Sequence, residues 1–387
     1  MITRTIFKHE HELFRQTVQR FIAQEIQPYH SEWEEQGKIP REAWLKAGGA
    51  GLLCCAIPEQ NGGIGGTFLH SAIVMEELGR SGASGPSFSL HSDIVAPYIL
   101  TYGTEAQKQR LLPGMASGEI IGAIAMTEPS GGSDLQAMRT TAIRDGDDYV
   151  INGQKTFISN AQNADFIILA AKTDPTARGK GVSLIIVETN RPGFKLGRPL
   201  HKIGSKAMDT SELFFDNVRV PVDNLLGVEG NGFLQLVTEL AQERLLQAIR
   251  STAASIRSTA CAEAALEWTV AYTSERQAFG KRLADFQNTQ FKLAEMKAEL
   301  MLQRVFVDRC IELHLERKLD AVDAAVAKMT STELQGKVMD QCLQLFGGWG
   351  YMWEVPIARA YADARMSRIA GGSIEIMKQI IARSMLS

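Results

Sequence analysis

Residues 125–134 hold the side chains best suited to contact a ligand. They read Ala-Met-Thr-Glu-Pro-Ser-Gly-Gly-Ser-Asp, a run of small and hydroxyl-bearing residues. A loop of this composition offers hydroxyl groups and free backbone N–H groups, which can hydrogen-bond the edge of a planar ligand. The same composition suits a solvated turn, and this segment alone leaves both interpretations open.

Cysteine and glycine spacing indicate no metal or phosphate site. The five cysteines, at positions 54, 55, 261, 310 and 342, show no CxxC spacing. We interpret them as reduced thiols of a cytosol-like compartment and predict no metal site. The glycine-rich residues 61–66 lack the lysine of a phosphate-binding loop and the spacing of a dinucleotide fingerprint, so they predict a plain connection.

The composition is typical of a soluble globular protein. The 387 residues suffice for two or three domains; 45% of them are hydrophobic and 22% are charged. With 41 basic and 44 acidic residues the net charge is −3, which argues against nucleic acid or an anionic membrane as the main partner. The longest apolar runs are too short for a membrane span, and the N-terminus lacks the apolar stretch of a signal peptide. We expect a cytoplasmic bacterial protein, or a mitochondrial matrix protein if the chain is a processed form.

Proline and glycine divide the chain into three zones, which predict an α+β protein. Residues 1–122 predict an N-terminal α-helical domain, residues 123–232 a middle β domain, and residues 233–387 a C-terminal helical domain. In the last zone the helix-breaking residues proline and glycine are rare, so we predict long helices with breaks near Gly280 and residues 316–319. Because strands do not alternate with helices, a doubly wound nucleotide-binding sheet is not predicted.

The middle zone contains one strong turn signal. The pair Asn152-Gly153 lies between two β-rich runs, residues 149–151 and 154–159. An Asn-Gly pair accepts the positive φ angles of a type I′ turn, so we predict a two-residue hairpin there. Further strands are predicted at residues 165–173, 182–189 and 211–220.

Several separated motifs occur in an order that resembles the acyl-CoA dehydrogenase family of flavoproteins. Besides residues 125–134, they are Arg-Gln-Ala-Phe-Gly at 276–280, Phe-Gln at 286–287, Gln-Leu-Phe-Gly-Gly-Trp-Gly-Tyr at 344–351, and Asp-Ala-Arg at 363–365 followed by Gly-Gly-Ser-Ile-Glu-Ile at 371–376. The resemblance covers nearly the whole chain. It is nearest to the long-chain branch, through residues 201–204, 242–246 and 347–354.

The resemblance implies two α-helical domains that flank a β-barrel-like middle domain, with a four-helix bundle as the C-terminal domain. It also implies FAD between the middle and C-terminal domains, with part of each site supplied by a neighbouring subunit. The residues that match the family's cofactor contacts are Met126, Thr127, Ser133, Phe157, Ile158, Ser159, Arg276, Phe279, Gln287, Gln344, Gly348, Ser373 and Glu375. Those that match its substrate contacts are Ser133, Gly179, Lys180, Arg244 and Gly372.

The resemblance gives three of these residues distinct roles. Thr127 would hydrogen-bond the flavin edge, Phe157 would cover one flavin face, and Arg276 would pair phosphate oxygens bidentately across a subunit interface. Each also has a plain structural alternative. By residue type alone, Phe157 suits a hydrophobic core, Arg276 a solvated helix and Gln344 a helix cap. Three aromatic residues are interpreted as packing residues: Trp349, Tyr351 and Trp353.

The implied reaction, α,β-dehydrogenation of an acyl-CoA thioester, needs a carboxylate base in a dry pocket and hydrogen-bond donors for the thioester carbonyl. Many family members place the base just before the final Gly-Thr, and that position here is Gly371. The long-chain and isovaleryl branches instead use a Glu-Arg pair on an earlier helix, which matches Glu243 and Arg244. Glu243 is therefore the candidate base, and Gly371 can still donate its backbone N–H. The alternative for Glu243 is an exposed carboxylate paired with Arg244 or Arg250.

A short internal repeat affects this assignment. Residues 250–253 and 257–260 both read Arg-Ser-Thr-Ala. The interval from Glu243 to Arg276 exceeds the family's usual spacing by about two helical turns, the length of this repeat. Either the helix is extended by two turns or the extra residues loop out, and both remain open at this point.

The resemblance predicts a dehydrogenase that passes electrons to an electron-transfer flavoprotein. Gly371 is smaller than Glu and Ala370 is also small, so we expect a roomy pocket for long or methyl-branched acyl groups, including terpenoid ones such as citronellyl-CoA. A homo-oligomer is expected, and the family commonly forms tetramers. Two alternatives stay open: a flavin oxidase or monooxygenase on the same fold, and a binding protein without turnover.

Overall fold

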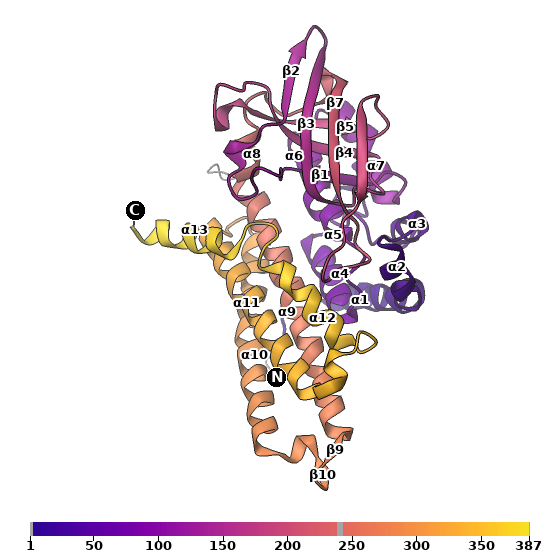
Figure 1. Ribbon diagram of the computed structural model, residues 1–387, viewed down its shortest axis with the longest axis vertical. Helices are drawn as coiled ribbons and strands as arrows, with labels where there is room; N and C mark the ends of the chain where they lie inside the picture. The colour runs from indigo at the N-terminus through magenta and orange to yellow at the C-terminus, as the bar shows by residue number, and fades with distance from the viewer. Residues whose placement is uncertain (1–2, 238–242, 387) are drawn as a thin grey trace.

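The computed structural model describes the backbone of residues 3–237 and 243–386, and the side chains of residues 3–236 and 251–386. Helices come first, a β-sheet follows, and a second set of helices ends the chain (Figure 1). The predicted α+β fold, with helical domains on both sides of a β domain in the sequence, is confirmed. Among the described residues, no helix combines the length and hydropathy that crossing a lipid bilayer requires.

The N-terminal part is built from short helices. Two of them start at capping boxes, in which the hydroxyls of Thr67 and Thr104 accept hydrogen bonds from backbone N–H groups in the first turn. Trp44, Tyr98 and Phe88 are fully buried and fill the spaces between the helices. The helices are α1 (His9–Phe21), α2 (His30–Gln36), α3 (Arg41–Gly49), α4 (Phe68–Ser81), α5 (Phe88–Leu90), α6 (Ala96–Tyr102) and α7 (Glu105–Ser117), with the π-helical turns η1 (Ile22–Ile26) and η4 (His91–Val95).

The middle part is an eight-stranded sheet. Its strands are β1 (Gly122–Ala125), β2 (Thr141–Asp145), β3 (Asp148–Ser159), β4 (Phe166–Lys172), β5 (Val182–Glu188), β6 (Phe194–Pro199), β7 (Thr210–Pro221) and β8 (Leu225–Leu226). Their order is β6-β7-β3-β2-β4-β5-β8, with β1 parallel to β4. β4 and β5 are buried on both faces, which explains their continuous apolar sequences. The strands predicted at residues 165–173, 182–189 and 211–220 are confirmed.

The predicted hairpin at Asn152-Gly153 is wrong, because β3 runs through both residues. Gly153 has a φ of 143° and lies at an irregularity in the pairing of β3 with β7. A Cβ atom there would come within 2.6 Å of the Thr140 hydroxyl oxygen, so the close approach of the chains requires a glycine. The turn between β2 and β3 is instead centred near Gly146, whose φ is 62°.

The C-terminal part begins with α8 (Gly232–Val237) and is dominated by three long helices that run side by side (Figure 1). These are α9 (Glu243–Glu275), α10 (Gln287–Leu315) and α11 (Ala321–Phe346). The short strands β9 (Gln277–Ala278) and β10 (Lys281–Arg282) join the first two, and α12 (Pro356–Ser367) and α13 (Ile374–Leu386) follow. The helix breaks predicted near Gly280 and residues 316–319 are thus confirmed.

Helix α9 is continuous over its 33 residues. It therefore passes through the repeated Arg-Ser-Thr-Ala tetrads without a break, and the extra residues do not loop out. At ~1.5 Å of rise per residue, a helix of this length is ~50 Å long. The side chains of the second tetrad lie on the bundle interior: Ser258, Thr259 and Ala260 are all buried.

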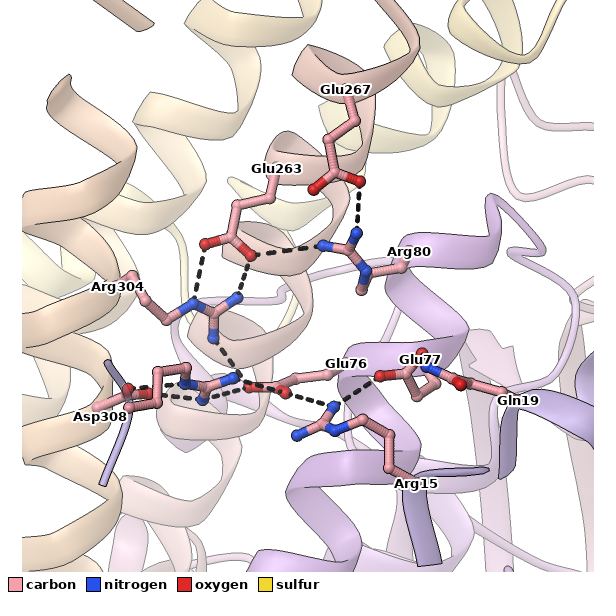
Figure 2. Close-up of polar contacts among 10 residues, drawn as sticks. Arg15, Gln19, Glu76, Glu77, Arg80, Glu263, Glu267, Arg304 and Asp308 are labelled. Atoms are coloured by element: carbon pink, nitrogen blue, oxygen red, sulfur yellow. Dashed lines mark hydrogen bonds and ion pairs between the residues drawn. The ribbon is translucent and has the colours of Figure 1, made fainter. Parts of the chain in front are cut away.

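A cluster of buried ion pairs joins the N-terminal helices to the C-terminal bundle (Figure 2). Glu76 on α4 accepts hydrogen bonds from Arg4, Arg15 and Arg304 at 2.7–3.0 Å. Burial alone would raise the pKa of the Glu76 carboxyl, but the three guanidinium groups outweigh it and lower that pKa to about 2. Arg304 also pairs with Glu263 on α9, so one network ties α4, α9 and α10 together.

Candidate functional site

The hydroxyl-rich loop leaves the sheet at the end of β1. It contains Met126, Thr127 and Ser133, and the Thr127 carbonyl accepts a 2.9 Å hydrogen bond from the Thr156 N–H on β3. Met126 and Thr127 are half-buried and Ser133 is exposed. The loop is therefore anchored at its start and open to a ligand farther along.

A buried ion pair fixes this anchor. Lys155 on β3 donates to the Met126 carbonyl oxygen at 2.9 Å and to Glu128 Oε1 at 2.8 Å. Glu128 also accepts the backbone N–H groups of Arg139 and Thr140, which close the loop. Burial alone would raise the pKa of the Glu128 carboxyl, but the Lys155 ammonium and the other donors outweigh it and lower that pKa.

Phe157 lies directly beside this anchor in an unusual conformation. Its φ is 60°, in the left-handed region, and its side chain is 66% exposed. The pairing of β3 with β7 is interrupted between Lys155 and Ile158, so Phe157 sits on a bulge. A bulky residue with positive φ costs ~1–3 kcal/mol and is found mainly where function requires it. The core alternative for Phe157 is wrong, because the ring faces outward.

The neighbours of Phe157 alternate between the two faces of β3. Ile158 is buried in the sheet core, so only its backbone can reach a ligand on the side of Phe157. Ser159 is half-buried.

Gly179 and Lys180 lie in a short 3₁₀ turn before β5, where Gly179 approaches the Phe233 ring and Lys180 is exposed.

The second candidate element is the loop between α12 and α13. Gly371 and Gly372 both have positive φ, 65° and 97°, and a Cβ on Gly371 would meet nothing within 4 Å. Ser373 follows, and its hydroxyl accepts the Ile376 N–H in the first turn of α13. Glu375 is exposed in that turn.

Glu243 is the first residue of α9 and Arg244 the second. Their side chains lie outside the described residues, so the predicted contacts of the base with its surroundings stay predictions. Figure 1 shows that the start of α9 and the loop before α13 both lie at the end of the bundle nearer the sheet. The start of α9, which is Glu243, and the loop that contains Gly371 therefore lie at the same end of the bundle.

A pocket of about 700 Å³ opens at the other end of α9. It brings together three residues that the sequence assigns to one cofactor segment, Arg276, Gln344 and Gly348. Tyr272 stacks on Phe346 with ring centroids 4.3 Å apart and donates to its carbonyl oxygen, which stiffens this part of the pocket. A guanidinium group beside an amide and open glycines can bind an anionic, polar group.

Two further predicted residues lie near this pocket without lining it. Phe279 is 96% exposed with a φ of 53°, on the turn between β9 and β10. Gln287 is exposed at the first position of α10. Within the chain its ring meets only the edge of the Phe286 ring among the described aromatic contacts, at 6.3 Å between centroids, so most of this apolar ring is left open to another molecule.

The interpretation of Trp349 and Tyr351 as packing residues is wrong for the isolated chain. Trp349 is 56% exposed and lines the pocket beside Arg276, and Tyr351 is also exposed. The glycines around these two residues, at positions 347, 348 and 350, are the sequence feature that could have indicated their exposure. They lie in a short 3₁₀ turn on the surface. Trp353 is half-buried under Lys206, whose ammonium lies 3.7 Å from its ring centroid.

Two candidate residues therefore lie at opposite ends of α9. Glu243 is the first residue of this helix, and Arg276, in the pocket, follows its last residue. A separation close to the helix length of ~50 Å exceeds the reach of any dinucleotide. A cofactor bound beside Glu243 therefore cannot also reach Arg276 of the same chain.

Comparison with known proteins supports one family for the whole chain. Three family models match in sequence order: the acyl-CoA dehydrogenase N-terminal domain at residues 8–119, the middle domain at residues 123–218 and the C-terminal domain at residues 230–386. The long-chain specific acyl-CoA dehydrogenase of rat mitochondria (Rattus norvegicus) is 50% identical over 386 residues, which are 99% of this chain and 88% of the relative.

Solved structures agree with the sequence comparison. An acyl-CoA dehydrogenase from Geobacillus kaustophilus superposes with a TM-score of 0.94 at 47% identity and covers 99% of this chain and 100% of its own. An acyl-CoA dehydrogenase from Bacillus anthracis, solved with FAD, has a TM-score of 0.91 at 30% identity and covers 100% of this chain and 68% of its own. With all three domains matched in order, this chain belongs to the acyl-CoA dehydrogenase family.

Proposed function

We propose that this protein is an FAD-dependent acyl-CoA dehydrogenase that converts an acyl-CoA thioester to the trans-2-enoyl-CoA. The observation that carries the proposal is the exposed, left-handed Phe157 beside the anchored loop of Thr127. An aromatic ring held outward next to hydroxyl and N–H donors suits a planar, polar-edged ring system such as a flavin. Family membership and the relative solved with FAD support the same cofactor.

The residues present fit FAD. Met126, Thr127, Phe157 and Ser159 would contact the flavin ring, and the turn at Ser373 would contact it from the C-terminal part. Arg276, Gln344 and Gly348 would hold the pyrophosphate and adenosine of an FAD bound to another copy of the chain, because Arg276 follows the end of α9 that lies opposite the proposed base, Glu243. When bound, FAD accepts the hydride that leaves Cβ of the substrate.

Glu243 is the proposed base that takes the proton from Cα. A thioester α-proton is weakly acidic, so this carboxylate needs a dry site and a stabilised carbonyl oxygen. The Gly371 N–H would hydrogen-bond that oxygen, where negative charge develops. Ser133, Gly179, Lys180, Arg244 and Gly372 would contact the rest of the acyl-CoA.

The substrate class follows from the space near the base. Gly371 carries no side chain, and a Cβ there would meet nothing within 4 Å. Ala370 beside it is also small. We therefore propose long or methyl-branched acyl groups, including terpenoid ones such as citronellyl-CoA, and the rat relative is named for long chains.

The proposed partners follow the resemblance. Electrons would pass to an electron-transfer flavoprotein, and the chain would form a homo-oligomer, a tetramer in the common case. The compartment would be the bacterial cytoplasm or the mitochondrial matrix, because all five cysteines are free thiols.

An anaerobic titration of the flavin absorbance tests the proposal. Straight-chain acyl-CoAs of increasing length and 3-methyl-branched ones are added to wild type and to Glu243→Gln. Long or branched thioesters should bleach the wild type, and Glu243→Gln should bind them without bleaching. The matched control is Glu295→Gln, an exposed carboxylate on α10.

Three outcomes contradict parts of the proposal. Equal bleaching of wild type and Glu243→Gln would place the base elsewhere. Bleaching by short straight chains alone would refute the substrate class. A wild type that no acyl-CoA bleaches would indicate a binding protein, and rapid peroxide formation in air without an added acceptor would indicate an oxidase or monooxygenase.

A further inference from the structure

Lys328 on α11 is among the most deeply buried side chains of the described residues, with 1% of its surface exposed. Lysine is rarely buried to this extent unless its ammonium group has strong hydrogen-bond partners. Here the ammonium donates to the carbonyl oxygen of Ala370 at 2.6 Å and to that of Gly372. Both acceptors belong to the loop before α13.

The Ala370 carbonyl belongs to the same peptide unit as the Gly371 N–H. No peptide bond among the described residues is cis, and in a planar trans peptide the C=O and N–H bonds point in opposite directions. When Lys328 holds the Ala370 oxygen inside the bundle, it therefore turns the Gly371 N–H outward, away from α11. Both glycines have positive φ, so the loop has few steric limits of its own, and Lys328 sets the direction of this N–H.

The Gly371 N–H is available for a ligand. Among the described residues no atom accepts a hydrogen bond from it, whereas the N–H groups of Ala370 and Ile374 donate to Met366 and Arg368. A hydrogen bond from a cation to a peptide oxygen also polarises the N–H of that peptide, and strengthens the hydrogen bond that this N–H can donate by ~10–30%. Lys328 therefore both aims this donor and strengthens it.

We infer that Lys328 is a positioning residue for the dehydrogenation: it orients and polarises the Gly371 N–H that binds the thioester carbonyl. This inference rests on the proposed function, since it assumes that Gly371 meets the thioester. The competing role is purely structural, in which Lys328 only caps the carbonyl groups that follow α12. The two roles differ in whether Lys328 affects the carbonyl of a bound ligand.

The test compares two ligands that differ in that carbonyl. The holoenzyme is titrated with an enoyl-CoA thioester and with an S-alkyl-CoA thioether of equal chain length, in wild type, Lys328→Met and Lys328→Arg. Wild type should bind the thioester more tightly than the thioether, and Lys328→Met should lose up to about tenfold of this preference, the worth of one good hydrogen bond. Lys328→Arg keeps N–H donors and should restore part of it. In steady-state kinetics, kcat should fall more than KM rises in Lys328→Met.

The control is Lys337→Met, on the same helix, where the lysine is half-exposed and paired with Glu299. If Lys328→Met weakens both ligands equally, the role is structural and the inference is wrong. If wild type shows no preference for the thioester, the carbonyl-binding role of Gly371 fails and the inference fails with it. Should Lys328→Met not fold, Lys328→Leu, which also lacks a hydrogen-bond donor, is measured instead, and an unchanged preference in that variant would also refute the inference.

Discussion

Asp93 offers the sharpest test of the electrostatics inside the N-terminal helices. It lies in the π-helical turn η4 and is 7% exposed, near Cys54 and Cys55. Burial raises the pKa of its carboxyl from 3.8 to about 7, because the charged form loses its hydration. In the folded protein this side chain is therefore largely neutral below pH 7.

The sign and size of the effect follow from linkage. The folded pKa is raised above the unfolded one, so the stability from this group is complete below pH ~4 and is lost as the pH rises through 7. At ~1.4 kcal/mol per pKa unit the full cost at alkaline pH is ~4 kcal/mol, of which ~3 kcal/mol develops between pH 5 and pH 8. Asp93→Asn has nearly the same shape and no charge, so we expect it to stabilise the protein increasingly over this range.

The assay is urea unfolding of the holoenzyme at pH 5, 6, 7 and 8, for wild type, Asp93→Asn and Asp340→Asn. Asp340 is exposed on α11, so Asp340→Asn serves as the control. The contributions of all other titrating groups to the pH dependence are common to wild type and variant and cancel in each difference. The free energy of unfolding of Asp93→Asn minus that of wild type should grow by ~3 kcal/mol from pH 5 to pH 8. A difference that stays constant with pH would refute the reasoning, because it would show that Asp93 does not titrate in this range.

Three further predictions concern buried contacts and are measured by urea or thermal unfolding. Lys155→Met leaves the Glu128 carboxylate buried without its partner, and should lower the free energy of unfolding by ~3–5 kcal/mol, much of which Glu128→Gln in the same chain should restore. Glu76→Gln should lower the free energy of unfolding at pH 7. Because the pKa of the Glu76 carboxyl is lowered in the folded protein, this loss of stability should shrink as the pH falls from 4.5 toward 2, and a loss independent of pH would contradict the reasoning. Gly204→Ala places a Cβ 2.5 Å from the Ala362 carbonyl carbon and should lower the free energy of unfolding by ~1–3 kcal/mol. An unchanged melting temperature would show that α12 shifts to make room for the Cβ.

The positions of proline and glycine predicted the helices and strands well, because these two residues act on the local backbone. The long helices and the strands at residues 165–173 and 182–189 appear where proline and glycine are rare and apolar residues are dense. The hairpin at Asn152-Gly153 failed because its signal is also local, whereas β3 pairs with β2 on one side and β7 on the other across those residues. Tertiary pairing overrode the turn propensity.

The sequence predicted which residues belong to the candidate site, but it predicted less well how they are arranged in space. Residue order alone identified Thr127, Phe157 and Arg276 through a family resemblance. The bulge that turns Phe157 outward depends on the register of β3 against β7, which no single segment encodes. The pocket beside Trp349 depends on the end of α9 meeting the end of α11, two segments far apart in the chain.

The length of α9 has a consequence for mixed assemblies. If the Glu243 end of one copy and the Arg276 end of another complete one site, two differently defective chains can correct each other. A pair made of one Glu243→Gln chain and one Arg276→Ala chain would concentrate both defects in one site and leave the other with two intact ends. Such heteromers would recover activity that neither variant has alone, so an allele defective at one end of the helix would be complemented by an allele defective at the other.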